Sequence, residues 1–405
     1  MKALQVDQKI TKLGMARVLS TLSPAAAARF GPLSLTTIDP PTLPGPGWHR
    51  VHTHLAGICG SDLATVEGRA SAYFADWVSF PFVPGHEVVG HLDDGRRVVI
   101  EPVLGHAARG FEPPFPGAAP GDGDDYAHLA RGHLEPGIQI GFCNSTCGGW
   151  APEFVAHESQ LHEIPDAMSD EQAVLVEPTA GGIHAALLTW PVVSGVEHPV
   201  VAVLGAGTMG LCAIAGLRRY VPGVQIVVGA RYPHQQALAK GLGADVVVKP
   251  DELARAVRRL TGSHMVGDHL SGGAHATIDA VGTSESIADC LRFTRPRGRV
   301  VLMGMPAEVT LDLTGLWHRE TQLVGAYTYG TETMPDGTRR RTFELAIETA
   351  HALGFERLLS ATYRIDDHED AIAHAAAAGR RAAVKVAFDL RPPVKAANHA
   401  QKESE

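Results

Sequence analysis

A glycine-rich loop near the middle of the chain most narrowly limits what this sequence can fold into. Gly205, Gly207 and Gly210 follow the unbroken apolar run 199–204 and precede the helix-like stretch 211–220. An apolar run without alternation is typical of a parallel strand that is buried on both faces. In a strand–turn–helix unit, such glycines make the tight turn, admit a pyrophosphate to the backbone and let the helix pack closely. The segment therefore predicts a dinucleotide site. The other loop residues expected to take part are Thr208 and Met209.

The stretches after this loop repeat the alternation of strand and helix. Apolar runs recur at 225–228, 246–248, 276–279 and 299–303, and helix-like stretches separate them. This alternation predicts a doubly wound parallel sheet with helices on both faces.

The first part of the chain has a different pattern, with short β-like runs between turn signals. Residues 48–55, 88–90 and 97–100 are predicted strands, as is 383–387 near the end of the chain. Residues 102–148 are rich in Gly, Pro and Ala and predict an irregular lobe. We expect a mostly-β domain over 1–185, a dinucleotide-binding domain over 186–330, and a return to the first domain with a polar tail over 331–405.

The residue after the second strand of the dinucleotide unit bears on cofactor choice. An acidic residue there would bind the ribose 2′-hydroxyl of NAD. This chain has Arg231 instead, and a guanidinium offers a planar, permanently charged partner for a phosphate. We therefore predict a preference for NADP(H) over NAD(H). The alternative is that Arg231 is an ordinary solvated side chain.

Four side chains predict a metal site. Cys59, His86, Glu87 and Glu177 lie in short segments that also contain glycine or proline. A thiolate, an imidazole and a carboxylate are the ligand types that hold a catalytic zinc while leaving one coordination position open. Taken alone, Cys59 would more often be a small buried hydrophobe. The combination predicts an open zinc site.

These motifs resemble the zinc-dependent medium-chain dehydrogenase/reductase superfamily, which includes alcohol, polyol and threonine dehydrogenases. The residues that carry the resemblance are 57–62, 85–90, 148–154 and 177–180. It implies an α/β protein in which a GroES-like, mostly-β catalytic domain is joined to a doubly wound Rossmann coenzyme domain. It also implies that Cys59, His86 and Glu177 bind the zinc, whereas Glu87 binds it directly or exchanges with water or substrate. The metal would polarise an alcohol or carbonyl oxygen.

The resemblance also implies roles for residues outside the ligand set. Ser61 would supply a hydroxyl beside the substrate. The further cofactor contacts would be Thr179, Val281, Met305 and Tyr327. The aromatic walls of the substrate pocket would be Tyr73, Trp77 and Trp150. Core packing under a loop is an equal alternative for the aromatic cluster.

Two departures from the family pattern matter. Relatives commonly have a histidine three residues after the hydroxyl of Ser61, but this chain has Ala64, so the proton must leave by another route. Many relatives have four lobe cysteines that bind a structural zinc, whereas this chain has only Cys143 and Cys147. Two thiols cannot fill a site that needs four donors. We therefore predict one catalytic zinc and no structural zinc. Three histidines of the lobe could supplement the thiols, but their spacing matches no known metal site. They are His106, His128 and His133.

The composition of the chain limits the classes of partner that the protein is expected to bind. A net charge of −9 over 405 residues argues against nucleic acid, because phosphate binding needs a basic face. No apolar run reaches membrane-spanning length. Five cysteines do not form a disulfide framework, and no secretory signal is evident, so we expect a cytoplasmic protein. Its partner would be a small-molecule substrate, and by resemblance it would be a homo-oligomer, either dimer or tetramer.

The sequence as a whole predicts a zinc-dependent oxidoreductase that transfers hydride between NADP(H) and an alcohol or its carbonyl. By the resemblance, the glutamate at position 177 implies a polyol-like or secondary alcohol as substrate. The missing histidine leaves open a reductase of an iminium or conjugated double bond. A non-catalytic cofactor-binding protein on the same fold is a further alternative.

Overall fold

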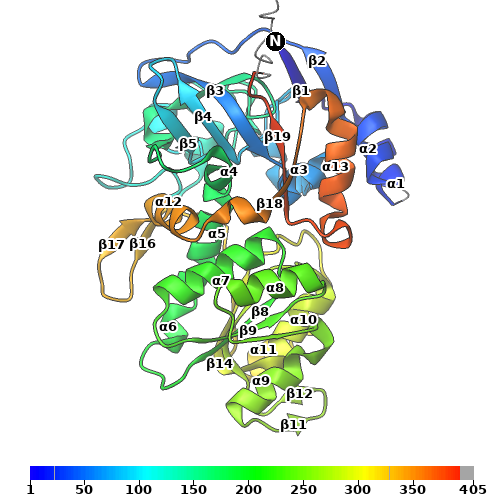
Figure 1. Ribbon diagram of the computed structural model, residues 1–405, viewed down its shortest axis with the longest axis vertical. Coiled ribbons are helices and arrows are strands. Elements are labelled where there is room, and N and C mark those ends of the chain that lie inside the picture. The colour runs from blue at the N-terminus through cyan, green and yellow to red at the C-terminus, as the bar shows by residue number, and fades with distance from the viewer. Residues whose placement is uncertain (22, 328, 393–405) are drawn as a thin grey trace, which may run out of the picture.

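The computed structural model of the chain describes residues 1–21, 23–327 and 329–392. It is built around two large sheets, which lie one above the other in Figure 1. The upper sheet has seven strands and is mostly antiparallel, and the lower has six strands that are all parallel. The predicted α/β class with a doubly wound sheet is confirmed. Residues 393–405, most of the predicted polar tail, lie outside the described residues.

The upper sheet takes strands from both ends of the chain. Its order is β18-β19-β3-β4-β5-β7, with β6 paired to β3. The bounds are β3 (Trp48–Gly57), β4 (Val88–Leu92), β5 (Arg97–Ile100), β6 (Glu153–His157), β7 (Leu161–Glu163), β18 (Leu359–Tyr363) and β19 (Lys385–Asp389). The predicted strands at 48–55, 88–90 and 97–100 are confirmed. The last predicted strand begins two residues later than expected, and as β19 it pairs antiparallel with β3.

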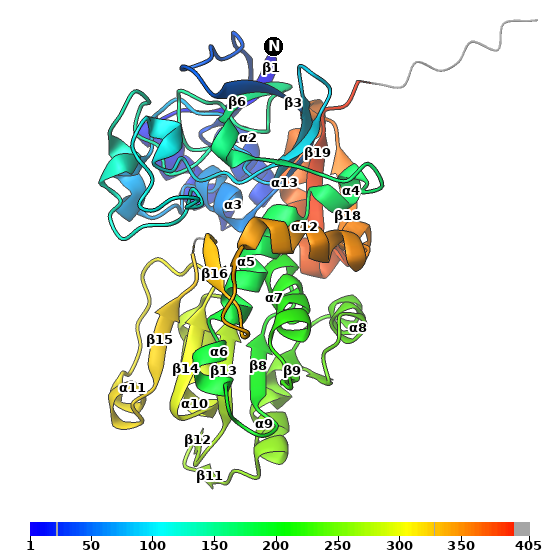
Figure 2. The same ribbon diagram turned by 90° about the vertical axis from the view of Figure 1, so that its left-hand side faces the viewer.

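The lower sheet has the order β10-β9-β8-β13-β14-β15. Its strands are β8 (Val200–Leu204), β9 (Gln225–Gly229), β10 (Val246–Val248), β13 (Ala274–Asp279), β14 (Thr294–Leu302) and β15 (Gln322–Gly325). The helices around it are α6 (Trp190–Val193), α7 (Thr208–Tyr220), α8 (Pro233–Gly241), α9 (Leu253–Thr261), α10 (Ser284–Phe293) and α11 (Thr314–His318), and they cover both faces (Figure 2). Strand order reverses between β8 and β13. Ligands of such sheets bind outside the carboxyl ends of the strands at this reversal.

Helix α5 (Val176–Leu187) lies where the two sheets meet (Figure 1) and packs against α7. The two backbones approach closely at glycines. A Cβ at Gly182 would lie 2.5 Å from the carbonyl carbon of Cys212, and one at Gly216 would lie 3.0 Å from the Cα of Ile183. Side chains at these two positions would force the helices apart.

Several elements were not predicted. Helices α1 (Ile10–Ser20) and α2 (Pro24–Phe30) are inserted between the paired strands β1 (Lys2–Val6) and β2 (Leu33–Thr37). A hairpin of β16 (Thr331–Thr333) and β17 (Arg339–Arg341) follows the lower sheet. Helix within 342–390 is expected from the sequence, and α12 (Thr342–Ala352) and α13 (His368–Ala376) lie there. Further α-helices and strands are α3 (Gly60–Val66), α4 (Asp170–Ala173), β11 (Met265–Val266) and β12 (His269–Leu270). Within the fully described lobe 102–148, the regular elements are two short 3-10 helices, as its composition predicts.

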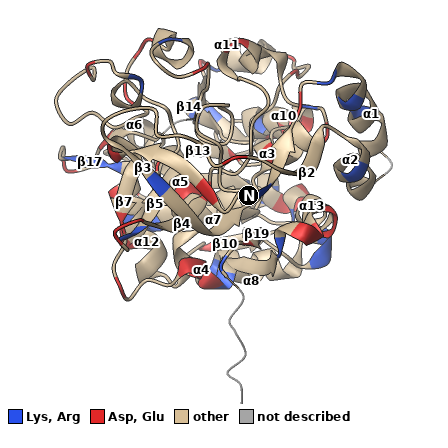
Figure 3. Ribbon diagram, turned by 90° about the horizontal axis from the view of Figure 1, so that it is seen from above, with Lys and Arg blue, Asp and Glu red and all other residues tan. Residues whose placement is uncertain are grey.

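Viewed from above, the ribbon shows Lys and Arg residues interspersed with Asp and Glu residues on many elements (Figure 3). Among the described residues, no helix combines the length and the apolar character needed to cross a bilayer.

Candidate active site

Cys59 and His86 are held beside each other by the loops that precede α3 and β4. Cys59 is the N-cap of α3, where its backbone N–H donates to Asp62 Oδ2 at 2.9 Å. His86 follows Gly85, whose φ is +96° and whose added Cβ would lie 2.4 Å from Trp150. The loop therefore needs glycine both for its backbone angle and for its packing. His86 is 3% exposed.

Asp62 lies behind the imidazole of His86. It is fully buried, and its Oδ1 lies 3.5 Å from His86 Nδ1. In the part of the chain that the structure describes, neither atom has a hydrogen-bond partner within the usual distance. Burial lowers the pKa of His86, but Asp62 and Cys59 raise it by more, so the pKa lies well above its ordinary value. A carboxylate on Nδ1 leaves Nε2 as the nitrogen available to a ligand.

Glu87 forms an ion pair with Lys385, a residue that the sequence analysis did not identify as part of the site. Lys385 Nζ lies 2.6 Å from Glu87 Oε1 and 2.5 Å from Oε2, and both side chains are buried. Burial lowers the pKa of Lys385, whereas Glu87 and Cys59 raise it, with a net increase. Lys385 therefore compensates the charge of Glu87, which argues against Glu87 as the resting metal ligand. A single lysine within the apolar run 383–387 was the available sequence signal.

Glu177 lies in the first turn of α5, close to His86, Glu87 and Lys385. Its Oε1 accepts a hydrogen bond from the hydroxyl of Tyr329 at 2.7 Å. Burial raises the pKa of Glu177 to about 7, and Glu87 adds to the rise, while His86 and Tyr329 oppose it. Tyr329 was also missed, because nothing in the pattern around it distinguishes it from other tyrosines.

The donor chemistry of this cluster fits a zinc ion. Sulfur, imidazole and carboxylate side chains are brought together here, with a carboxylate behind the imidazole as in known zinc sites. As the side chains stand, no three His, Cys, Asp or Glu groups among the described residues converge tightly enough to hold an ion. By the chemistry of the donor set, zinc would be held by Cys59, His86 and Glu177.

The glycine loop has the geometry expected of a phosphate cradle. Gly205 follows β8 with φ +99°, and an added Cβ would lie 2.8 Å from Val281. An added Cβ at Gly207 would meet no atom within 4 Å, so its backbone faces open space at the start of α7. Exposed backbone at a helix N-terminus can bind phosphate oxygens.

The other expected cofactor residues are distributed around this loop. Val281, Met305 and Tyr327 follow β13, β14 and β15 and are 46%, 55% and 47% exposed, at the edge where the cofactor is expected. Thr208 donates its hydroxyl to Val384 O at 3.2 Å. Thr179 is fully buried, and its hydroxyl donates to Leu175 O at 2.6 Å. Met209 lies against Gly181, where an added Cβ would be 2.8 Å from its methyl carbon.

Arg231 is exposed just beyond β9 and lines a cavity of about 240 Å³. The other lining residues are Lys249, Pro250 and Asp251. Two cations therefore face one carboxylate, which leaves a net positive environment. Lys249 was not predicted; its position directly after β10 was the signal that could have identified it.

The predicted substrate residues have different environments. Tyr73 is 71% exposed and meets the ring of Trp77 edge-on at 5.4 Å, so core packing does not explain it. Ser61 is partly exposed in the first turn of α3.

The assignment of Trp150 to the pocket needs correction. Its ring is fully buried against Phe388, and Nε1 donates to Gly57 O at 3.2 Å. Trp150 supports the site from within the core.

The lobe is organised around a buried guanidinium. Arg109 is 1% exposed and donates to Leu104 O (3.2 Å), Arg131 O (2.9 Å), Glu135 O (3.2 Å) and Gly137 O (2.6 Å). Cys143 and Cys147 are buried free thiols. His106 and His128 stack at 3.8 Å. These four side chains form no metal-binding group in the described residues.

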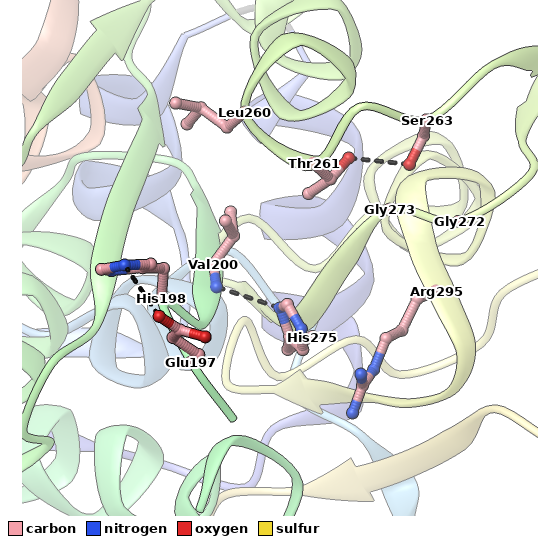
Figure 4. A pocket seen from close by; sticks show the side chains of 10 residues that line it. All are labelled: Glu197, His198, Val200, Leu260, Thr261, Ser263, Gly272, Gly273, His275 and Arg295. Carbon is pink, nitrogen blue, oxygen red and sulfur yellow. Dashed lines mark hydrogen bonds and ion pairs between the residues drawn. The ribbon is translucent and has the colours of Figure 1, made fainter. Parts of the chain in front are cut away.

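A second cavity, of about 330 Å³, lies at the amino ends of the parallel strands (Figure 4). Val200 and His275, from β8 and β13, line it, and the N–H of Val200 donates to His275 Nδ1 at 3.0 Å. The glycine loop follows the other end of β8, so this cavity is separate from the candidate active site.

Comparison with known proteins agrees with this architecture. The family model for the alcohol dehydrogenase GroES-like domain matches residues 45–166, and that for zinc-binding dehydrogenases matches residues 208–342. Human sorbitol dehydrogenase is 30% identical over 335 residues, covering 75% of this chain and 84% of that protein.

Solved structures share the fold at lower identity. The crystal structure of 2R,3R-butanediol dehydrogenase from Bacillus subtilis has a TM-score of 0.66 at 19% identity, covering 96% of this chain and 99% of that one. A protein described as a zinc-binding dehydrogenase from Sinorhizobium meliloti 1021, bound to NADP, has a TM-score of 0.66 at 22% identity, covering 96% and 98%. The chain therefore belongs to the zinc-dependent medium-chain dehydrogenase/reductase superfamily and is an oxidoreductase of the alcohol dehydrogenase type.

Proposed function

We propose that this chain binds one zinc ion through Cys59, His86 and Glu177 and transfers hydride between NADP(H) and an alcohol or its carbonyl. The observation that carries the proposal is that Cys59 and Glu177 both lie near His86, with Asp62 behind the imidazole at 3.5 Å. The sorbitol dehydrogenase relatives favour a polyol-like or secondary alcohol. The glutamate at position 177 agrees with that substrate class.

The side chains around the proposed metal have separable tasks. When bound, zinc supplies Lewis-acid polarisation of the substrate C–O bond. Asp62 holds the imidazole of His86 so that Nε2 is presented to the metal. Lys385 balances the buried charge of Glu87 and so limits the negative charge around the site. Ser61 is the hydroxyl nearest in sequence to Cys59 on the proposed substrate side, and we assign it the first step of proton exchange with solvent.

Val281, Met305 and Tyr327 would contact the nicotinamide from the strand ends, and the exposed Tyr73 and Trp77 would border the substrate. We further propose a cytoplasmic homo-oligomer. All five cysteines are free thiols, which suits a reducing compartment.

The first test is metal content and turnover on the same preparation. We expect about one zinc per chain and activity towards polyols or secondary alcohols that chelation abolishes and zinc restores. Two zinc ions per chain would contradict the single-site proposal. Turnover confined to iminium or conjugated double-bond substrates would favour the alternative reaction suggested by Ala64.

The second test concerns the 2′-phosphate. Charge-assisted hydrogen bonds contribute about 1.5–3 kcal/mol, so Arg231→Gln should weaken NADPH binding about 10- to 100-fold and leave NADH binding nearly unchanged. Lys240→Gln, which removes an exposed cation at the far end of α8, is the matched control. Dissociation constants can be followed by quenching of intrinsic fluorescence. Equal losses for both coenzymes, or tighter binding of NADH by the wild type, would contradict the preference.

A further inference from the structure

Two hydrogen bonds join α5 to the segment that follows β15. Tyr329 donates its hydroxyl to Glu177 Oε1 at 2.7 Å. Seven residues further along the helix, His184 Nδ1 lies 2.7 Å from Glu332 Oε1. Residues seven apart in an α-helix share one face. The segment 329–332 therefore follows this face of α5 and contacts it at two points.

The lobe also contacts this segment, through Asp122. Asp122 Oδ1 accepts from the backbone N–H of Thr331 at 2.8 Å, and Oδ2 accepts from its hydroxyl at 2.6 Å. Asp122 Oδ2 also accepts from the N–H of Ala119 at 2.8 Å, which fixes the carboxylate to the lobe. An added Cβ at Gly330 would lie 2.3 Å from Asp122 Oδ1, so a side chain there would displace the carboxylate from its present position.

The phenol of Tyr329 is well placed to restrict Glu177. Tyr329 is 5% exposed, and its ring packs against that of Phe343 with the ring centroids 5.4 Å apart. Among the residues that the structure describes, Tyr329 is the one hydrogen-bond donor to Glu177, and it bonds Oε1 only. A glutamate side chain has several rotatable bonds, and an anchored oxygen removes much of that freedom.

We propose that Tyr329 is a positioning residue that fixes the carboxylate of Glu177, and that Asp122 acts through it, so that the lobe sets the orientation of a metal ligand. This inference rests on the proposed function, because it takes Glu177 as the carboxylate ligand of the zinc. In this arrangement Oε1 is held by protein and Oε2 is left for the metal. The lobe thereby influences the site through two hydrogen-bonded contacts, Asp122 with Thr331 and Tyr329 with Glu177, which the backbone of Gly330 connects.

The test compares three variants in metal-free protein titrated with zinc against a coloured chelator. Tyr329→Phe removes the hydroxyl, and Asp122→Asn removes one acceptor of the support. Tyr363→Phe is the matched control, because it removes a phenol that lies 2.8 Å from His374 Nδ1 on a different pair of elements. Partners of metal ligands typically contribute 10- to 100-fold in metal affinity. We expect the dissociation constant for zinc to rise at least 10-fold in Tyr329→Phe, less in Asp122→Asn, and not in Tyr363→Phe.

A second readout is the absorption spectrum of the cobalt(II)-substituted protein, which reports ligand geometry independently of turnover. The inference expects the ligand-field bands to shift in Tyr329→Phe and to be unchanged in Tyr363→Phe. Wild-type affinity and an unchanged spectrum in Tyr329→Phe would overturn it. Wild-type zinc affinity in Asp122→Asn would overturn the contribution of the lobe. If Tyr329→Phe fails to fold, the zinc affinity of Asp122→Asn alone decides whether the inference stands. Failure of the unmodified protein to bind zinc would instead overturn the proposed function, and this inference with it.

Discussion

Replacing Arg109 with methionine should destabilise the lobe, because this side chain gathers four backbone carbonyls from residues 104–137. Methionine keeps much of the apolar stem but removes every donor. The bonds to Leu104 O and Gly137 O are buried, so water cannot readily replace them, whereas the other two are only partly buried. Hydrogen bonds to a charged group are worth about 1.5–3 kcal/mol each. Losing the two buried bonds should therefore cost about 3–6 kcal/mol.

The measurement is thermal unfolding of the purified protein, together with limited proteolysis of the lobe. We expect Tm to fall by at least about 5 °C and cleavage within 102–148 to accelerate. Arg131→Met is the matched control, because its side chain is exposed and only its carbonyl meets Arg109. Arg109→Lys should recover part of the loss. A Tm within 1 °C of the wild type for Arg109→Met would refute the reasoning.

Two further predictions concern buried and partly buried charges. Lys385→Met leaves the carboxylate of Glu87 buried without its cation and should cost about 3–5 kcal/mol in chemical denaturation, whereas Lys385→Met combined with Glu87→Gln should cost less. Equal losses in the single and double variants would contradict the ion-pair argument. For Asp170, burial raises the pKa, but hydrogen bonds to His54 and Arg97 outweigh it and lower the pKa to about 2. Because this pKa is depressed below the unfolded value, the stabilisation is present above about pH 4 and is lost as pH falls towards 2. The free energy of unfolding of Asp170→Asn should therefore depend less on pH in that window than that of Asp93→Asn, a control at an exposed position. Identical acid unfolding curves for the two variants would contradict this prediction.

The parallel sheet was predictable because each buried strand leaves an uninterrupted apolar run. The run 199–204 and its following glycines fix β8, the turn and the start of α7 with little ambiguity. The antiparallel sheet was predicted less fully, since strands such as β6 and β7 are short and pair with partners far away in sequence. The helices α1 and α2 were missed because the alanine-rich and mixed stretches there give only a weak amphipathic pattern.

The proposed metal donors could be read from local motifs, but their partners could not. Lys385 and Tyr329 reach the site from segments more than 150 residues away from the carboxylates that they bond, so only the folded chain brings them together. Trp150 was assigned to the pocket by its position in the family pattern, yet Gly85 and Phe388 enclose its ring. Burial of that kind depends on packing between distant segments.

The glycine contacts between α5 and α7 have a consequence for how the molecule can move. Glu177 begins one of these helices and the coenzyme loop leads into the other, and the two backbones meet without intervening side chains at Gly182 and Gly216. Such an interface tolerates almost no sliding or separation, so the two helices should travel as one rigid unit. If the clefts of this enzyme open and close around its ligands, the hinge must lie elsewhere, in the segments that flank this pair.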